Sequence, residues 1–382
     1  MNKNSGKFYK DGCDNSMLKI KYIVYLFVLA CLLVACNTSN GSDEMQERVK
    51  PSVKGVSDVD VINTHGGVEG VKNMQVFFEN TQKGIASDLR IVHYTIEGDP
   101  MVTDLSYNGD TIEVEHDTTR DTYGSGQVTT ITCGKLLVES NPTNIAYIVT
   151  DCKGLPYGME SVLQIDYNMN QQDLFEIELK YGIELENEIN TVSKTMKKVI
   201  STQETQSTKD FELPESVMQE VYKELVLMNY LGEKDLQAKC TEEDAKNYQL
   251  KVHINGGQRE FKWTSCDQSY DGEKLTEIAE YVIEQSEIEQ NEMPEVTVQG
   301  YVLEIKDNML LIVEDVNMVE FEWLKEELPQ NDMNTWIFDF TNLEGVTTEE
   351  YEIGDKVQAT IQGDIIGSKP GKAVVKEIKK IN

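Results

Sequence analysis

The histidines are the side chains of this sequence best suited to acid–base chemistry near neutral pH, because the imidazole pKa is about 6.5. The chain has four of them. His65 stands in the run Asn63-Thr64-His65-Gly66-Gly67, where the glycines allow a tight turn and the imidazole could act as a general base. The same run has the composition of a helix start, with Asn63 or Thr64 as the capping residue. We interpret it as a helix-start motif.

The other histidines lie in segments that alternate as strands do. His93 and His116 could sit on neighbouring strands and hold a metal ion, and His253 lies in a third alternating run. A strand histidine that faces solvent is the simpler interpretation, and we expect it for His93 and His116. The sequence has no G-x-S-x-G elbow, P-loop, H-E-x-x-H pair or EF-hand loop. We therefore predict no catalytic residue, no metal and no cofactor.

Carboxylates and tryptophans offer two further candidates for binding. Four carboxylates follow one another in a short segment: Glu113, Glu115, Asp117 and Asp121. They could hold calcium weakly, but alternating carboxylates on an edge strand usually form a solvated face that discourages aggregation, and we favour that interpretation. The tryptophans are Trp263, Trp323 and Trp336. They could line a ligand groove, although we expect core or rim positions.

Four cysteines downstream of the N-terminal segment predict two disulfides. These are Cys133, Cys152, Cys240 and Cys266. Four cysteines allow three pairings, and the nearest-neighbour pairing joins Cys133 to Cys152 and Cys240 to Cys266. Disulfides persist outside the cytoplasm; reduced, buried cysteines are the alternative. Spacings of 19 and 26 residues lack the close ligand pairs of zinc sites. We expect the two local bridges.

An apolar run near the N-terminus predicts export. Residues 23–35 carry no charge and follow Lys19 and Lys21. The run has 13 residues, fewer than the roughly 20 that span a bilayer, and it fits the apolar segment of a signal peptide. Met17 begins a segment of the usual signal-peptide composition, whereas residues 1–16 are polar. We expect translation to start at Met17.

The end of this run, Leu33-Val34-Ala35-Cys36, resembles the lipobox of bacterial lipoproteins. In that family the cysteine is diacylated on sulfur and becomes the first residue of the mature protein. The resemblance implies that residues 1–36 are a lipoprotein signal peptide with its lipobox and that Cys36 carries palmitate-type chains. Two acyl chains are enough for stable anchoring. We expect a protein held on the extracytoplasmic face of the cell membrane.

The charge of the chain limits its partners. Its 67 acidic and 35 basic residues give a net charge of -32. Proteins that bind nucleic acid need a basic surface, and so do proteins that bind anionic lipid through charge. We therefore expect no nucleic-acid partner, and contact with the membrane through the lipid anchor.

Composition divides the rest of the chain into a linker and three modules. Residues 37–55 are polar and predict a flexible tether. Residues 56–195 predict an α+β domain with an antiparallel sheet, and residues 196–290 predict a small domain of helix, hairpin and helix. Residues 295–382 predict five short strands. The fold class is α+β: several domains, antiparallel sheets with few helices, and a C-terminal five-stranded OB-like β-barrel.

Turn signals mark the joints between these elements. Residues 98–100 and 108–110 separate three strand patterns of the first module. Asn255 and Gly256 predict the hairpin turn of the second module. The alternation of the third module changes phase at Gly300, which predicts a β-bulge at that residue.

Several of these runs resemble known families. The run that contains His65, the run Ile91-Val92-His93-Tyr94-Thr95-Ile96-Glu97-Gly98-Asp99-Pro100 and Lys180-Tyr181-Gly182 are similar to a family of uncharacterised lipoprotein domains of Gram-positive, spore-forming bacteria. Gly300-Tyr301-Val302, Val313-Glu314-Asp315, Gly354-Asp355-Lys356-Val357 and Pro370-Gly371-Lys372-Ala373 are similar to a second uncharacterised family of exported modules. The resemblance implies location and architecture and supplies no catalytic residue.

We therefore predict a membrane-anchored extracytoplasmic lipoprotein that is not an enzyme and displays binding or interaction modules. The expected partner, besides the membrane, is an unknown envelope protein or wall component. Two alternatives stay open. One is an enzyme that acts on envelope material through a site assembled only in three dimensions, and the other is an inhibitor or immunity-type protein.

Overall fold

The computed structural model describes residues 55–64, 67–124, 126–201, 203–288, 296–328 and 333–381. The predicted signal peptide, Cys36, nearly all of the tether, His65 and Gly66 lie outside the described residues. The described part contains four α-helices and twenty strands, most of them antiparallel. No helix within those ranges has the length and apolar composition that crossing a bilayer requires.

Six strands form the first sheet, in the order β2-β1-β3-β4-β5-β6. They are β1 (Val61–Thr64), β2 (Gly67–Glu69), β3 (Ser87–Tyr94), β4 (Pro100–Tyr107), β5 (Ile112–Asp117) and β6 (Val128–Cys133). β1 and β3 are parallel, and the other neighbours are antiparallel. Helix α2 (Val71–Lys83) buries Met74 and Phe77 in the core and ends at Gly84. The φ of Gly84 is 69°, a conformation that glycine adopts without strain.

The expected helix start at residues 63–67 is wrong, because Asn63, Thr64 and Gly67 belong to paired strands. Asn63 and Thr64 end β1, Gly67 begins β2, and Thr64 pairs with Gly67. The Thr64 hydroxyl donates to the Gly67 carbonyl over 2.9 Å instead of capping a helix. Helix α2 begins at Val71, and no side chain caps it. The physical reason is that Asn63 continues the parallel pairing of β1 with β3, which a helix would end.

A three-stranded sheet follows, formed by β7 (Lys135–Ser140), β8 (Asn144–Thr150) and β9 (Met159–Asp166). The Cys133–Cys152 disulfide joins the end of β6 in the first sheet to the turn after β8. The short 3-10 helices η1 (Pro156–Gly158) and η2 (Met169–Gln171) flank β9.

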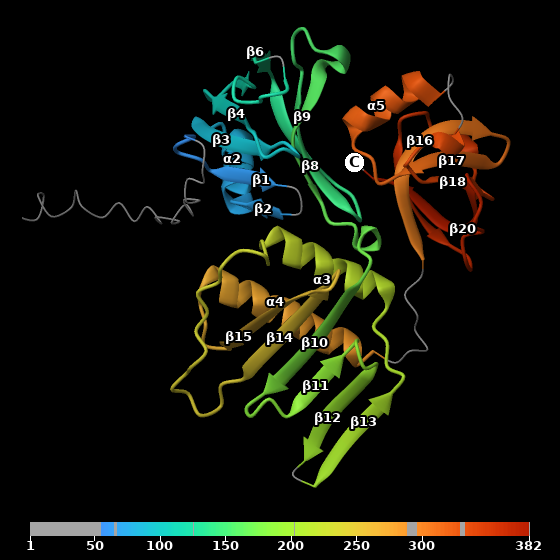
Figure 1. Cartoon of the computed structure of the whole chain (residues 1–382). Coiled ribbons are helices and arrows are strands. Elements are labelled where there is room, and N and C mark those ends of the chain that lie inside the picture. The colour runs from blue at the N-terminus through green and yellow to red at the C-terminus, as the bar shows by residue number, and fades with distance from the viewer. Residues whose placement is uncertain are drawn as a thin grey trace, which may run out of the picture. The chain divides into compact units, whose positions relative to one another are not determined.

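The second six-stranded sheet has the order β13-β12-β11-β10-β14-β15 and is antiparallel throughout. Its strands are β10 (Phe175–Gly182), β11 (Asn187–Asn190), β12 (Thr195–Ser201), β13 (Glu204–Lys209), β14 (Asn247–Ile254) and β15 (Gly257–Thr264). Helices α3 (Glu215–Leu227) and α4 (Tyr270–Ser286) lie across one face of this sheet (Figure 1). The Cys240–Cys266 disulfide joins the loop after α3 to the segment after β15.

The boundary predicted at residues 195/196 falls inside this second sheet. β10 and β11 come before that boundary, yet they pair with β14 and β12, which come after it. One apolar core runs through the first sheet, the three-stranded sheet and the second sheet. The hydrophobic pattern identified the strands, but it contained no information about which strands pair.

The C-terminal part consists of five strands that close on themselves in the order β16-β17-β18-β20-β19, which we call the C-terminal sheet. They are β16 (Thr297–Lys306), β17 (Met309–Glu314), β18 (Phe340–Glu344), β19 (Lys356–Ile361) and β20 (Gly371–Lys380), with α5 (Met318–Glu327), η4 (Met333–Thr335) and η5 (Thr348–Glu350) between them. One apolar cluster fills the inside of this sheet, and a second packs under α5.

The bulge predicted at Gly300 lies two residues further on, between Val302 and Glu304. Gly300 itself pairs regularly with Glu314 and Val357. A side chain at Gly300 would put its Cβ atom 2.2 Å from the Val313 carbonyl oxygen. The glycine therefore serves a close approach between two strands. The apolar residues change phase because Val298 and Val302 face the inside of the sheet, whereas Tyr301 and Leu303 pack under α5 on its other face.

Candidate functional site

A cavity of about 450 Å³ lies beneath the β1–β2 hairpin, and we call it the hairpin cavity. The hairpin contributes Asn63, Thr64 and Gly67, and the end of β3 contributes His93. The end of β9, η2 and one face of α3 complete the wall. Pockets for small molecules usually measure about 300–1,000 Å³, so the size suits a small ligand.

His93 forms part of the cavity wall and is held by two neighbours. Its Nδ1 atom lies 3.3 Å from the amide nitrogen of Asn63, and the ring also hydrogen-bonds the Val162 backbone. An amide nitrogen can only donate, so Nδ1 accepts and the ring proton sits on Nε2. Burial lowers the pKa of His93. Burial therefore favours the neutral form of the ring, whose two hydrogen bonds are made within the protein.

Another part of the wall is rich in side-chain amides. The Gln164 amide donates to Asp166 over 2.9 Å, and Gln172 hydrogen-bonds the Tyr222 side chain. Gln171 is exposed at the cavity mouth, and its side chain has no partner within the described part of the chain. Asp166 is the single carboxylate among the described lining residues, which include no lysine or arginine.

The hairpin cavity brings together residues from two runs that were singled out in the sequence. Asn63, Thr64 and Gly67 come from the expected helix-start motif, and His93 and Tyr94 come from the second run of the resemblance. Sequence reasoning missed the amides of β9 and η2 and the Tyr222 ring. Polar residues between strands usually mean a turn, so their composition carried no signal of a site.

The three described histidines are partly buried and paired, so the expectation that His93 and His116 face solvent is wrong. The Nε2 atom of His116 lies 3.2 Å from a Glu160 carboxylate oxygen, and that of His253 lies 2.8 Å from Glu178. β9 contributes both Glu160 and Val162, so it covers the face of the first sheet that carries His93 and His116. These two histidines are not on neighbouring strands, because β4 lies between β3 and β5.

The remaining candidates do not line the hairpin cavity. Glu113 and Glu115 are exposed, as a solvated face requires, although β5 is an inner strand and not an edge strand. Trp263 is 1% exposed and stacks on Tyr248 at 5.1 Å between ring centroids. Among the described residues, the one group of three potential metal ligands is Cys240, Glu242 and Cys266. The two cysteine sulfurs form a disulfide. The group therefore has too few free ligands for a metal site.

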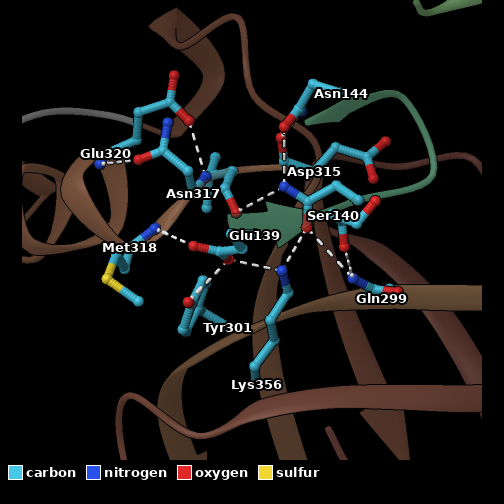
Figure 2. A network of polar contacts seen from close by, with 12 residues as sticks. Glu139, Ser140, Asn144, Gln299, Tyr301, Asp315, Asn317, Met318, Glu320 and Lys356 are labelled. Atoms are coloured by element: carbon cyan, nitrogen blue, oxygen red, sulfur yellow. Dashed lines mark hydrogen bonds and ion pairs between the residues drawn. The ribbon is translucent and has the colours of Figure 1, made fainter. Parts of the chain in front are cut away.

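A buried network of polar contacts joins β7 to the C-terminal sheet, and we call it the Glu139 network (Figure 2). The Glu139 and Lys356 side chains form an ion pair, and each is 8% exposed. Glu139 also accepts from the Tyr301 hydroxyl and from the Met318 backbone N–H, both over 2.8 Å. Lys356 donates to Asn141 as well. Burial lowers the pKa of Lys356, although Glu139 opposes this effect.

The Glu139 network reaches the hairpin cavity through Asn317. Its side chain caps α5 by accepting from the Glu320 backbone, and its amide donates to Gln164 over 2.7 Å. Gln164 in turn donates to Asp166 in the cavity wall. A continuous set of hydrogen bonds therefore connects the start of α5 in the C-terminal part with the cavity.

Comparison with known proteins matches two parts of the chain to domains whose function is unknown. Residues 58–147 match the family described as domain of unknown function (DUF4362). Residues 299–382 match the family described as protein of unknown function (DUF3221). This confirms that two parts of the chain resemble uncharacterised families, although Lys180-Tyr181-Gly182 lies outside the first match. The lipoprotein character and the Gram-positive origin stay predictions. No curated protein is significantly similar to the chain.

Two solved structures of one bacterial protein are similar to a quarter of the chain or less. The crystal structure of a YobA protein from Bacillus subtilis subsp. subtilis strain 168 is 13% identical, covers 23% of this chain and 95% of its own, and has a TM-score of 0.18. The NMR structure of Bacillus subtilis YobA 21–120 is 17% identical, covers 25% of this chain and 91% of its own, and has a TM-score of 0.19.

Proposed function

We propose that the chain is a membrane-anchored extracytoplasmic lipoprotein that binds an envelope component through the hairpin cavity and performs no catalysis. One observation carries this proposal. Segments from β1, β3, β9, η2 and α3 converge on one small polar cavity. Burial lowers the pKa of its histidine, whose ring hydrogen-bonds Asn63 and the Val162 backbone. Such a wall recognises a ligand without transferring a proton to it.

The anchor and the location are part of the same proposal. The lipobox-like run supports lipidation of Cys36, and two disulfides suit an oxidising compartment outside the cytoplasm. The net charge of -32 would keep such a body soluble above the membrane.

The C-terminal sheet is, in this proposal, an OB-like barrel. Its closed strand order and the parallel pair β18–β20 support that assignment. OB barrels bind oligonucleotides or oligosaccharides. From Glu295 onward the sequence has 8 basic and 18 acidic residues, which disfavours a nucleic-acid ligand.

Site-directed crosslinking in the native envelope tests the proposed function. A photoreactive amino acid replaces Gln171 at the cavity mouth in the full chain. A matched control carries it at Gln203, an exposed glutamine in the turn between β12 and β13. We expect an adduct, identified by mass spectrometry, that forms from position 171 and not from position 203. Identical adducts from both positions would contradict a binding role for the cavity.

A further inference from the structure

We propose that the hairpin cavity binds a neutral, polyhydroxylated ligand, namely a sugar of one or two rings, free or at the end of a glycan. This inference rests on the proposed function, because it names the ligand class of the same cavity. It draws on the charge of the wall, on its hydrogen-bonding groups and on its apolar part.

The charge of the wall disfavours an anion. Asp166 is the one carboxylate among the described lining residues, and burial lowers the pKa of His93. Phosphates and carboxylates are usually recognised by arginine, by lysine or by clustered backbone N–H groups. A nucleotide, a phosphate or an organic acid would meet a negative wall on a chain of net charge -32.

The hydrogen-bonding groups of the wall include both donors and acceptors. Asn63 gives its amide nitrogen to His93, which leaves its carbonyl oxygen as an acceptor. Thr64 gives its proton to Gly67, which leaves the lone pairs of its oxygen. The Gln171 amide brings both a donor and an acceptor. Sugar hydroxyls also donate and accept, whereas an ammonium group has no acceptor to offer Gln171.

Part of the cavity lining is apolar. Val68, Tyr222 and Val226 are buried side chains that line it. The face of a sugar ring carries C–H groups that pack on such a surface, while its hydroxyls point to the amides. An inorganic ion would leave this part without a partner.

Binding titrations with the full chain test the ligand class. The protein is kept in polyoxyethylene detergent micelles, so that no sugar headgroup competes. The probes are glucose, N-acetylglucosamine and cellotetraose, with spermidine and citrate as the cationic and anionic comparisons. Binding is measured by calorimetry and by saturation-transfer NMR. Tighter binding of cellotetraose than of glucose points to a glycan end, and equal binding points to a free sugar.

Three variants distinguish a sugar from a cation as the ligand of the hairpin cavity. Gln171→Leu removes an exposed amide and is expected to weaken sugar binding about 3- to 10-fold, the effect of one or two hydrogen bonds. Gln203→Leu makes the same change away from the cavity and should leave binding unchanged. Asp166→Asn removes the one carboxylate of the described wall but keeps an acceptor for Gln164, so it should abolish binding of a cation such as spermidine.

Two results would overturn the sugar inference. In the first, spermidine binds, Asp166→Asn abolishes that binding, and no sugar binds. The ligand is then a cation, and the proposed function still holds. If none of the probes binds, the sugar inference is wrong. The crosslinking result at Gln171 then decides separately whether the cavity binds anything in the envelope.

Discussion

Replacing Lys356 by methionine removes the cation from the Glu139 network, which joins β7 to the C-terminal sheet. Methionine keeps most of the length of the side chain but cannot donate. Glu139 would stay at 8% exposure with the Tyr301 hydroxyl and the Met318 N–H as its donors. A carboxylate buried without its counter-charge is costly, because neither water nor a cation compensates it.

The expected loss of stability is about 3 kcal/mol. Removing one partner of a buried ion pair costs about 3–5 kcal/mol. The lower end applies here because two neutral donors remain on Glu139. The loss falls on the C-terminal sheet, since undocking or unfolding that sheet returns Glu139 to water. The core of the two six-stranded sheets is a separate cluster and is not expected to respond.

Hydrogen exchange read by mass spectrometry resolves these two parts. A loss of about 3 kcal/mol corresponds to roughly hundredfold faster opening of β19 and β20. Peptides from β14 and β15 serve as the internal reference. The matched control is Lys372→Met, which changes an exposed lysine of the same sheet. The combined variant Glu139→Leu with Lys356→Met should recover part of the loss, because it removes both charges.

Equal exchange of β19 in the Lys356→Met and Lys372→Met proteins would refute this reasoning. It would mean that water reaches Glu139 in solution or that the C-terminal sheet is not held by this network. Faster exchange in β14 and β15 as well would contradict the separation of the two cores.

Three further predictions concern pH, disulfides and the lipid anchor. Burial raises the pKa of Glu314 from 4.5 to about 7. Protonation of this side chain therefore stabilises the fold fully below about pH 4.5, and the stabilisation is lost as the pH rises through about 7. We expect the free energy of unfolding of the C-terminal sheet to fall by about 3 kcal/mol between those pH values. Urea unfolding at several pH values measures this dependence, and Glu314→Gln should remove it. Replacing both Cys133 and Cys152 by alanine opens a loop of 19 residues and should lower the free energy of unfolding by about 3 kcal/mol in urea titrations. Cys36→Ser should move the chain from the detergent phase to the aqueous phase in phase-partition experiments.

Each of these predictions has a matched control. Glu349→Gln changes an exposed glutamate of the C-terminal part and should preserve the pH dependence of its stability. A reducing agent should destabilise the unmodified chain but not the double alanine variant, apart from any effect on Cys240–Cys266. Cys31→Ser changes a cysteine inside the apolar run and should leave partitioning unaltered. Loss of membrane attachment in both cysteine variants would argue against Cys36 as the anchor.

Much of the fold could be predicted from local patterns. The turn signals at residues 98–100 and 108–110 separate β3, β4 and β5 as expected, and Asn255 and Gly256 form the turn between β14 and β15. The nearest-neighbour disulfides also form. These features depend on residues close together in the sequence, where turn chemistry and side-chain alternation act directly.

Two local predictions failed because tertiary contacts outweighed local preference. Residues 63–67 have the composition of a helix cap, but the pairing of β1 with β2 and β3 places Asn63, Thr64 and Gly67 in strands. The apolar residues of β16 change phase because α5 covers the outer face of the strand, and the bulge lies between Val302 and Glu304. In both cases packing against another element, which the local pattern does not show, decided the outcome.

The sequence by itself determined the character of this protein: an acidic chain with an export-like N-terminus, a strand-rich body and cysteines spaced for two local bridges. The tertiary structure alone decided where a ligand could bind. Asn63, His93, Gln171 and Tyr222 are far apart in the chain, and no spacing rule connects them. The same holds for Glu139 and Lys356, whose pairing depends on how the C-terminal sheet meets β7. Local sequence fixes turns and periodicity, whereas sites of this kind depend on which elements pack together.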